Sequence, residues 1–115
     1  MKNNREYTRI PSDSEGVIFT SRGDYACEYK NLSETGFSAF IDKKGLDLER
    51  GDRISFQIVD DDEGQIIQAN ASVRWASESE DGTTIGCEVT GYNHDMYLYV
   101  VLKKARSAYY RKVLV

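Results

Sequence analysis

The sequence predicts a mainly β domain: a six- to seven-stranded antiparallel β-barrel followed by a C-terminal α-helix. From about residue 15 to residue 91, apolar and polar residues alternate with the two-residue period of half-buried strands. Short segments of turn-forming residues interrupt this alternation. After residue 92 the apolar residues recur at helical spacing. A closed sheet is the expected form, because it leaves no exposed strand edges.

The length of 115 residues fits one domain. We divide it into a mobile leader at 1–14, the barrel at 15–91 and the helical segment at 92–115. An apolar fraction of 40% and a charged fraction of 30% are typical of a globular protein. No apolar run has the length of a membrane span, and the polar start lacks the apolar region of a signal peptide. We therefore expect a cytoplasmic protein.

The first three strands are expected at residues 17–20, 25–29 and 36–41, with turns at 22–24 and 31–36. In the second strand Tyr25, Cys27 and Tyr29 share one face. Two cysteines do not form a disulfide framework, so Cys27 and Cys87 are interpreted as small buried hydrophobic residues.

Three further strands are expected after the connection at 42–52. The first, at 53–59, turns Ile54, Phe56 and Ile58 inward. In the next, Ile67, Ala69, Ala71, Val73 and Trp75 share one face, and the last covers 85–89. The acidic segment at 60–63 lacks the ligand spacing of a calcium loop, and the single histidine, His94, has no partners at ligand spacing. We expect no metal site.

A helix is expected over roughly residues 94–112, with Asn93 or Asp95 as its cap. It either caps the barrel or docks against a partner. Its later turns carry five basic residues, which suits the negative end of the helix dipole: Lys103, Lys104, Arg106, Arg111 and Lys112. These cations are either a docking surface or solvated charge, and solvated charge is the favoured interpretation.

Charge is unevenly distributed along the chain. Residues 1–11 carry three basic and one acidic side chain, residues 12–91 carry 7 basic and 17 acidic ones, and residues 92–115 carry five basic ones and one acidic. An acidic barrel opposes binding to nucleic acid, although eight tyrosines and four phenylalanines leave stacking of single strands as an alternative. No nucleophile–base pair or phosphate-binding glycine motif is evident, so we expect neither an enzyme nor a cofactor.

Two short motifs stand in an informative order. Arg5 and Arg9 lie four residues apart ahead of the first strand, and Asn31-Leu32-Ser33-Glu34-Thr35-Gly36 lies between the second and third strands. Each motif is weak alone. Together the chain resembles the PilZ domain family, which has R-x-x-x-R in a leader and (D/N)-x-S-x-x-G on a barrel. The segments 71–75, ending in tryptophan, and 85–89, with its glycine, also resemble that family's last two strands.

The resemblance implies a ligand, cyclic dimeric GMP (c-di-GMP). It implies the ligand-binding residues Arg5, Arg9, Asn31, Ser33 and Gly36, with Arg74 and Trp75 as secondary candidates. Arginine suits this ligand, because its fork meets the O6 and N7 acceptors of guanine, stacks on purines and binds phosphate. Trp75 either covers a base or fills the mouth of the barrel.

The implied function is that of a receptor and adaptor. Binding would draw the leader onto the barrel and signal to a separate, unidentified protein partner that controls motility, adhesion or exopolysaccharide. The alternative is a PilZ-like interaction module that acts without ligand.

Overall fold

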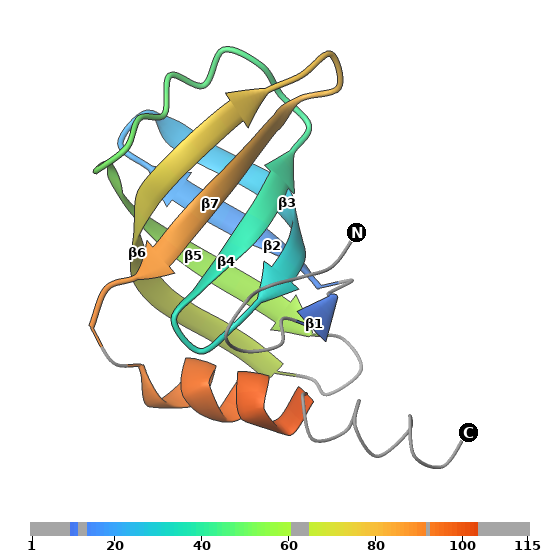
Figure 1. Ribbon diagram of the computed structural model, residues 1–115, viewed down its shortest axis with the longest axis vertical. Helices are drawn as coiled ribbons and strands as arrows, with labels where there is room; N and C mark the ends of the chain where they lie inside the picture. Colours follow the sequence, from blue (N-terminus) through green and yellow to red (C-terminus); the bar gives the residue numbers. More distant parts are fainter. Residues whose placement is uncertain (1–9, 12–13, 61–64, 92, 104–115) are drawn as a thin grey trace, which may run out of the picture.

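The computed structural model describes residues 10–11, 14–60, 65–91 and 93–103 (Figure 1). Within these residues the strands are β1 (Ile10–Pro11), β2 (Glu15–Thr20), β3 (Gly23–Leu32), β4 (Gly36–Ile41), β5 (Arg53–Asp60), β6 (Gln65–Glu78) and β7 (Thr83–Val89). All pairings are antiparallel, and the order β3-β2-β5-β6-β7-β4 closes into a ring because β4 also pairs with β3. The predicted fold class is confirmed: a six-stranded barrel with a short additional strand and a C-terminal helix.

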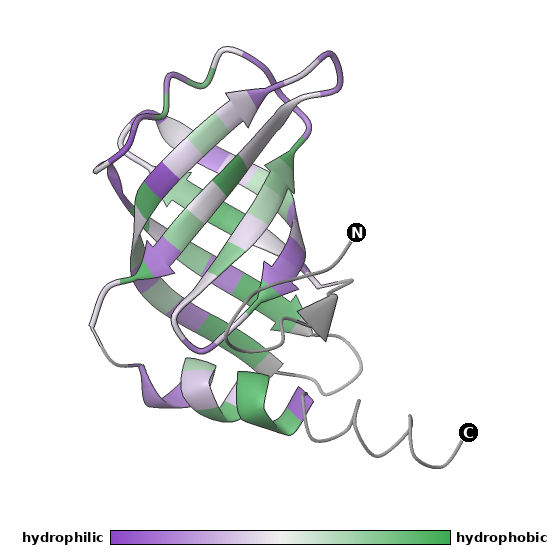
Figure 2. Ribbon diagram, in the orientation of Figure 1, coloured by the Kyte–Doolittle hydropathy of each residue, from purple (hydrophilic) through white to green (hydrophobic). Residues whose placement is uncertain are grey.

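The barrel is filled by the inward-facing half of the alternating pattern. Ile54, Phe56 and Ile58 are buried, as their spacing predicts, and Figure 2 shows hydrophobic and hydrophilic residues interleaved along the long strands of the barrel. The Tyr29 ring meets the Phe37 ring edge-on, with centroids 5.3 Å apart. Its hydroxyl donates a hydrogen bond of 2.6 Å to the carbonyl of Gln57 on β5, so the polar atom of this buried tyrosine is satisfied.

Two β-bulges break the alternation, and both change which side chains face outward. One lies in β3 between Tyr29 and Asn31, and the other lies in β6 between Val73 and Trp75. A bulge adds one residue to a strand and so reverses the facing of the residues beyond it. The prediction that Trp75 shares one face of the strand with Val73 is therefore wrong: Val73 is fully buried, whereas Trp75 is 48% exposed on the outside. Trp75 does not fill the barrel.

The turn expected at residues 31–36 is shorter in the structure. Asn31 still belongs to β3, and only the residues between Leu32 and Gly36 connect the strands. The predicted leader at 1–14 also contains a strand that its sequence does not suggest. This strand, β1, pairs with the end of β3, so that Ile10 lies opposite Leu32.

The C-terminal helix lies across one end of the barrel (Figure 1). Its described part covers residues 94–103, and the rest of the predicted span to 112 lies outside the described residues. Asn93 caps it, because its side-chain oxygen accepts a hydrogen bond of 2.8 Å from the amide of Met96. Met96, Tyr99 and Val100 are buried in the barrel core, so the helix closes the barrel. None of the described helical residues forms a segment with the length and apolarity to cross a membrane.

Candidate functional site

A row of paired residues runs across the outside of the barrel. Pro11 pairs with Asn31, Asn31 with Ser38, Ser38 with Gly86, and Gly86 with Trp75. The row therefore crosses β1, β3, β4, β7 and β6 in turn. The two bulges create it, since they turn Asn31 and Trp75 toward the same outer surface.

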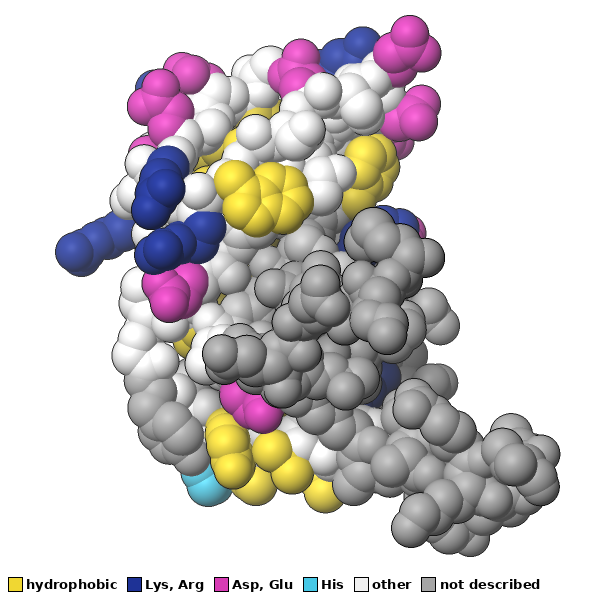
Figure 3. Space-filling model, in the orientation of Figure 1, with side chains coloured by type: hydrophobic (Ala, Val, Ile, Leu, Met, Phe, Trp, Pro, Cys, Tyr) yellow, Lys and Arg dark blue, Asp and Glu magenta, His cyan; other side chains and the backbone are white. Residues whose placement is uncertain are grey.

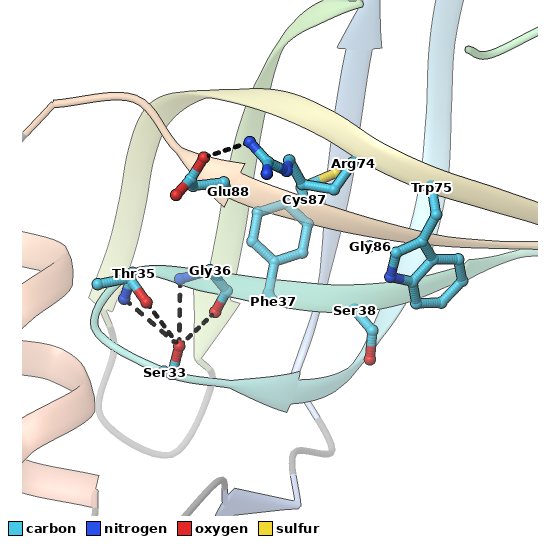
Figure 4. Close-up of a pocket in the computed structure, with 10 residues that line it drawn as sticks. All are labelled: Ser33, Thr35, Gly36, Phe37, Ser38, Arg74, Trp75, Gly86, Cys87 and Glu88. Atoms are coloured by element: carbon cyan, nitrogen blue, oxygen red, sulfur yellow. Dashed lines mark hydrogen bonds and ion pairs between the residues drawn. The ribbon is translucent and has the colours of Figure 1, made fainter. Parts of the chain in front are cut away.

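A hollow of ≈ 240 Å³ lies beside this row, between the β3–β4 turn and the outer faces of β4, β6 and β7 (Figure 4). It brings together four of the residues that the sequence proposes: Ser33, Gly36, Arg74 and Trp75. Asn31 does not line the hollow, but its side-chain amide donates a hydrogen bond of 3.1 Å to the hydroxyl of Ser38, which does. The same face carries exposed hydrophobic side chains, whereas acidic ones gather at the barrel end away from the helix (Figure 3).

The β3–β4 turn is held by the side chain of Ser33. This buried hydroxyl accepts hydrogen bonds from the amides of Thr35, at 3.4 Å, and Gly36, at 3.2 Å. The Ser33 amide donates to the carbonyl of Gly36, at 2.9 Å. The Thr35 carbonyl accepts from the amide of Val89, at 2.9 Å, and so fixes the turn to β7. Ser33 thus shapes the edge of the hollow with its own hydroxyl.

Gly36 is required by the closeness of a neighbouring strand. A Cβ at this position would come 2.4 Å from the carbonyl oxygen of Cys87. The sequence suggests that a turn and the approach of the ligand require this glycine. The structure shows a further reason, because the pairing of β4 with β7 leaves no room for a Cβ here. Gly86 is similar, because a Cβ there would come 2.2 Å from Nε1 of the Trp75 indole.

Arg74 occupies the bulge of β6 and points along the outer surface. Its guanidinium Nη1 donates a hydrogen bond of 2.9 Å to Oε1 of Glu88 on β7. Glu88 pairs with Gly36 on one side and Ser72 on the other, so it stands among the strands that form the hollow.

The thiols of Cys27 and Cys87 are buried, as the sequence predicts. Burial raises the pKa of the Cys27 thiol to about 11 and that of Cys87 to about 12, so both are protonated at neutral pH. Across the part of the chain that the structure describes, no three metal-ligating side chains gather into a metal site.

Family comparison adds to this geometry. The sequence matches the model of the PilZ domain over residues 3–98, which include both motifs and all the strands that the structure describes. The chain belongs to the PilZ domain family. No curated protein matches this PilZ domain by sequence.

Solved structures share its fold at low sequence identity. The PilZ domain of YcgR from Escherichia coli, solved with c-di-GMP, superposes with a TM-score of 0.72 at 15% identity, covering 98% of this chain and 100% of that one. The inhibitor of motility MotI/DgrA from Bacillus subtilis superposes with a TM-score of 0.75 at 15% identity and 93% coverage of this chain. The present PilZ domain spans 52% of that Bacillus protein.

Arg5 and Arg9, the first motif, lie outside the described residues. Their attachment point is nevertheless described, because Ile10 directly follows Arg9 and is paired with Leu32, the residue before Ser33. Consecutive Cα atoms lie about 3.8 Å apart, so the leader of this PilZ domain joins the barrel next to the second motif.

Sequence reasoning did not propose six of the ten residues that line the hollow: Ser38, Gly86, Glu88, Thr35, Phe37 and Cys87. The two-residue period offers a signal for the first, since Ser38 is two residues beyond Gly36 on one strand. Glu88 follows Gly86 at the same interval. That β4 and β7 are neighbours, however, is visible only in the fold.

Proposed function

We propose that this PilZ domain is a receptor for c-di-GMP. The observation that carries the proposal is the pairing of β1 with the end of β3, which tethers the arginine leader beside the N-x-S-x-x-G turn and its hollow. The E. coli YcgR PilZ domain, which has the same fold, is known with this ligand. The present chain has every defining residue of the two motifs, R-x-x-x-R and N-x-S-x-x-G.

The residue types at the hollow suit a guanine dinucleotide. The half-exposed Trp75 indole offers a face on which a base can stack. The guanidinium groups of Arg5 and Arg9 provide forks for the O6 and N7 edge of guanine and for phosphate oxygens. The amide of Asn31 can pair with a guanine edge, and Arg74 adds a cation at the rim.

The hollow needs a cover to hold such a ligand. Its ≈ 240 Å³ is below the roughly 300–1,000 Å³ of pockets that enclose drug-sized molecules. The leader can supply that cover, because Arg5 and Arg9 are four residues apart and an extended chain of that length spans at most about 14 Å. The leader is also net basic, whereas the barrel segment is acidic, so it brings the charge that an anionic ligand requires.

Calorimetric titration tests the proposal directly. We expect heat of binding with c-di-GMP, and none with linear GMP or cyclic dimeric AMP at the same concentration. At about 100 times its dissociation constant the ligand should stabilise the fold by roughly 2.7 kcal/mol. An unchanged melting curve at saturating c-di-GMP rejects the proposal.

Trp75 offers a second readout, because it is the single tryptophan of the chain and lines the hollow. We expect c-di-GMP to change its fluorescence emission in a saturable way, with the dissociation constant found by calorimetry. Stacking of a base would also shield the indole from a soluble quencher such as iodide. If calorimetry shows binding while emission and quenching stay constant, the ligand does not contact Trp75.

Signalling to a separate protein is the second part of the proposal. The buried hydroxyl of Ser14 lies 3.0 Å from the hydroxyl of Tyr99 on the C-terminal helix, and the Ser14 carbonyl accepts a hydrogen bond from Tyr29. Ser14 lies three residues beyond Pro11 of β1. A leader that closes over a ligand would therefore act on the helix through this contact, and an order–disorder step of this kind converts binding into a signal.

Replacing Tyr99 by phenylalanine should uncouple the helix from the leader. We expect Tyr99→Phe to keep its c-di-GMP affinity within about fivefold, since the lost hydrogen bond contributes about 1 kcal/mol and lies outside the hollow. Ligand-dependent protection of the helix amides at 94–103 from hydrogen exchange should disappear. The control is Tyr97→Phe, an exposed tyrosine on the same helix. Unaltered protection in Tyr99→Phe would contradict this route.

The output process belongs to the same proposal. The Bacillus protein of this fold is an inhibitor of motility, which supports control of motility among the outputs that the family implies. The alternative, an interaction module that acts without ligand, is favoured by the exposed side chains of Tyr97, Leu98 and Leu102 on the helix. Capture of a partner with the same affinity in the presence and absence of c-di-GMP would select that alternative.

A further inference from the structure

A closed ion pair stands at the rim of the hollow. Arg74 and Glu88 are in contact at 2.9 Å, and their side chains are 50% and 56% exposed, so both remain accessible to a ligand. Among the described residues that line the hollow, Arg74 is the one cation and Glu88 the one anion. While they are paired, the described rim presents no net charge to an incoming phosphate.

The fold fixes the two partners differently. Glu88 is held in β7 between Gly36 of β4 and Ser72 of β6, so its backbone cannot leave the hollow without breaking the barrel. Arg74 sits at the bulge, where the β6 backbone has no partner on β7. Its long side chain can change its contact while the strand stays in place. The arginine is therefore the partner that can exchange an acceptor.

We propose that Glu88 sets the c-di-GMP threshold of this PilZ domain by holding Arg74 as an internal competitor of the ligand phosphate; the inference rests on the proposed function. Glu88 engages Nη1 of Arg74, a donor that a phosphate oxygen would also use, so the carboxylate and the phosphate compete for this contact. An exposed ion pair is weak, so the ligand displaces Glu88 at modest cost and the carboxylate tunes affinity without blocking binding.

Calorimetric titration of four chains tests the competition: the native chain, Glu88→Gln, Arg74→Gln and the double variant. Glutamine keeps the size of the glutamate side chain and removes its charge. We expect Glu88→Gln to bind c-di-GMP about fivefold more tightly than the native chain, in keeping with the strength of an exposed ion pair. When Arg74 is already replaced by glutamine, Glu88→Gln should improve the binding free energy by less than half as much, because the cation for which Glu88 and the ligand compete is gone.

The matched control is Asp47→Asn. It removes one carboxylate from another exposed ion pair, Arg22–Asp47, which lies outside the hollow. Its c-di-GMP affinity should equal that of the native chain. Unfolding curves without ligand should agree for the native chain, Glu88→Gln and Asp47→Asn, because exposed pairs contribute little to stability.

The remaining outcomes separate the inference from the proposed function. Binding by the native chain with no gain in Glu88→Gln overturns the role of Glu88 and leaves the receptor in place. If Glu88→Gln raises the c-di-GMP affinity equally with and without Arg74, Glu88 acts only by repelling the ligand. If Asp47→Asn raises the affinity as much as Glu88→Gln does, the effect comes from net charge. Either result overturns the proposed competition. Absence of binding in both the native chain and Glu88→Gln rejects the receptor and the inference with it.

Discussion

Replacing Arg9 by alanine is expected to weaken c-di-GMP binding by about a hundredfold, and replacing Arg5 to do the same. A hydrogen bond to a charged group contributes about 1.5–3 kcal/mol, and each arginine fork can make two such bonds. Loss of about 3 kcal/mol corresponds to a factor of roughly a hundred. The effect should fall on binding and leave the barrel intact, because all the core residues that the structure describes lie at Ile18 or later in the chain.

The control for these variants is Arg22→Ala. Arg22 lies in the turn before β3, at the opposite end of that strand from Asn31, and its ion pair is with Asp47. Like the two leader variants, Arg22→Ala removes one positive charge from the chain, but it leaves the charge of the leader unchanged. Calorimetry should give the native affinity for Arg22→Ala. Native affinity in Arg9→Ala would show that the leader does not hold the ligand.

Replacing Gly36 by alanine is expected to have the second large effect, this time on folding as well as on binding. The new methyl group would stand 2.4 Å from the Cys87 carbonyl oxygen, which belongs to the backbone of β7 and cannot rotate away. The β4–β7 pairing must shift, at a cost of about 2 kcal/mol, which lowers the melting temperature by roughly 10 °C. The shift also moves the Ser33 turn, so c-di-GMP affinity should fall.

Gly45→Ala is the comparison for this change. Gly45 has a φ of +69° and no atom within 4 Å of an added Cβ, so alanine there meets backbone strain alone, about 1 kcal/mol. Urea unfolding should rank Gly36→Ala as the less stable of the two. If Gly45→Ala is instead the less stable variant, β7 can move to accommodate a Cβ at position 36, and Gly36 is required for ligand binding rather than for stability.

The barrel could be predicted from the sequence because its signal is local. The alternating pattern predicts that Ile54, Phe56 and Ile58 face the core, whichever strands are their neighbours. The start of the helix is likewise predicted by its cap, Asn93. The bulges could not be predicted, because a bulge is a relation between two strands. Nothing near Trp75 in the sequence shows that Val73 and Trp75 pair with adjacent residues of β7.

The candidate site was predictable in part for the same reason. The N-x-S-x-x-G turn is a local pattern, and its serine and glycine do meet at the hollow. The ion pair between Arg74 and Glu88 and the pairing of Ile10 with Leu32 join segments that are distant in sequence. A two-residue strand such as β1 has no period to detect, so only the folded barrel reveals where the leader attaches.

Amide chemical shifts in an NMR titration with c-di-GMP test the central claim most directly, since they show where the ligand lies. The account predicts saturable shifts in the leader, in the turn at 33–36 and at Trp75 and Glu88, with Gly45 unchanged as an internal reference. A second hollow, lined among others by Phe19 of β2, Ser55 of β5 and Asn70 of β6, provides the alternative location. Shifts confined to that hollow, with the leader and the turn unaffected, would contradict the account.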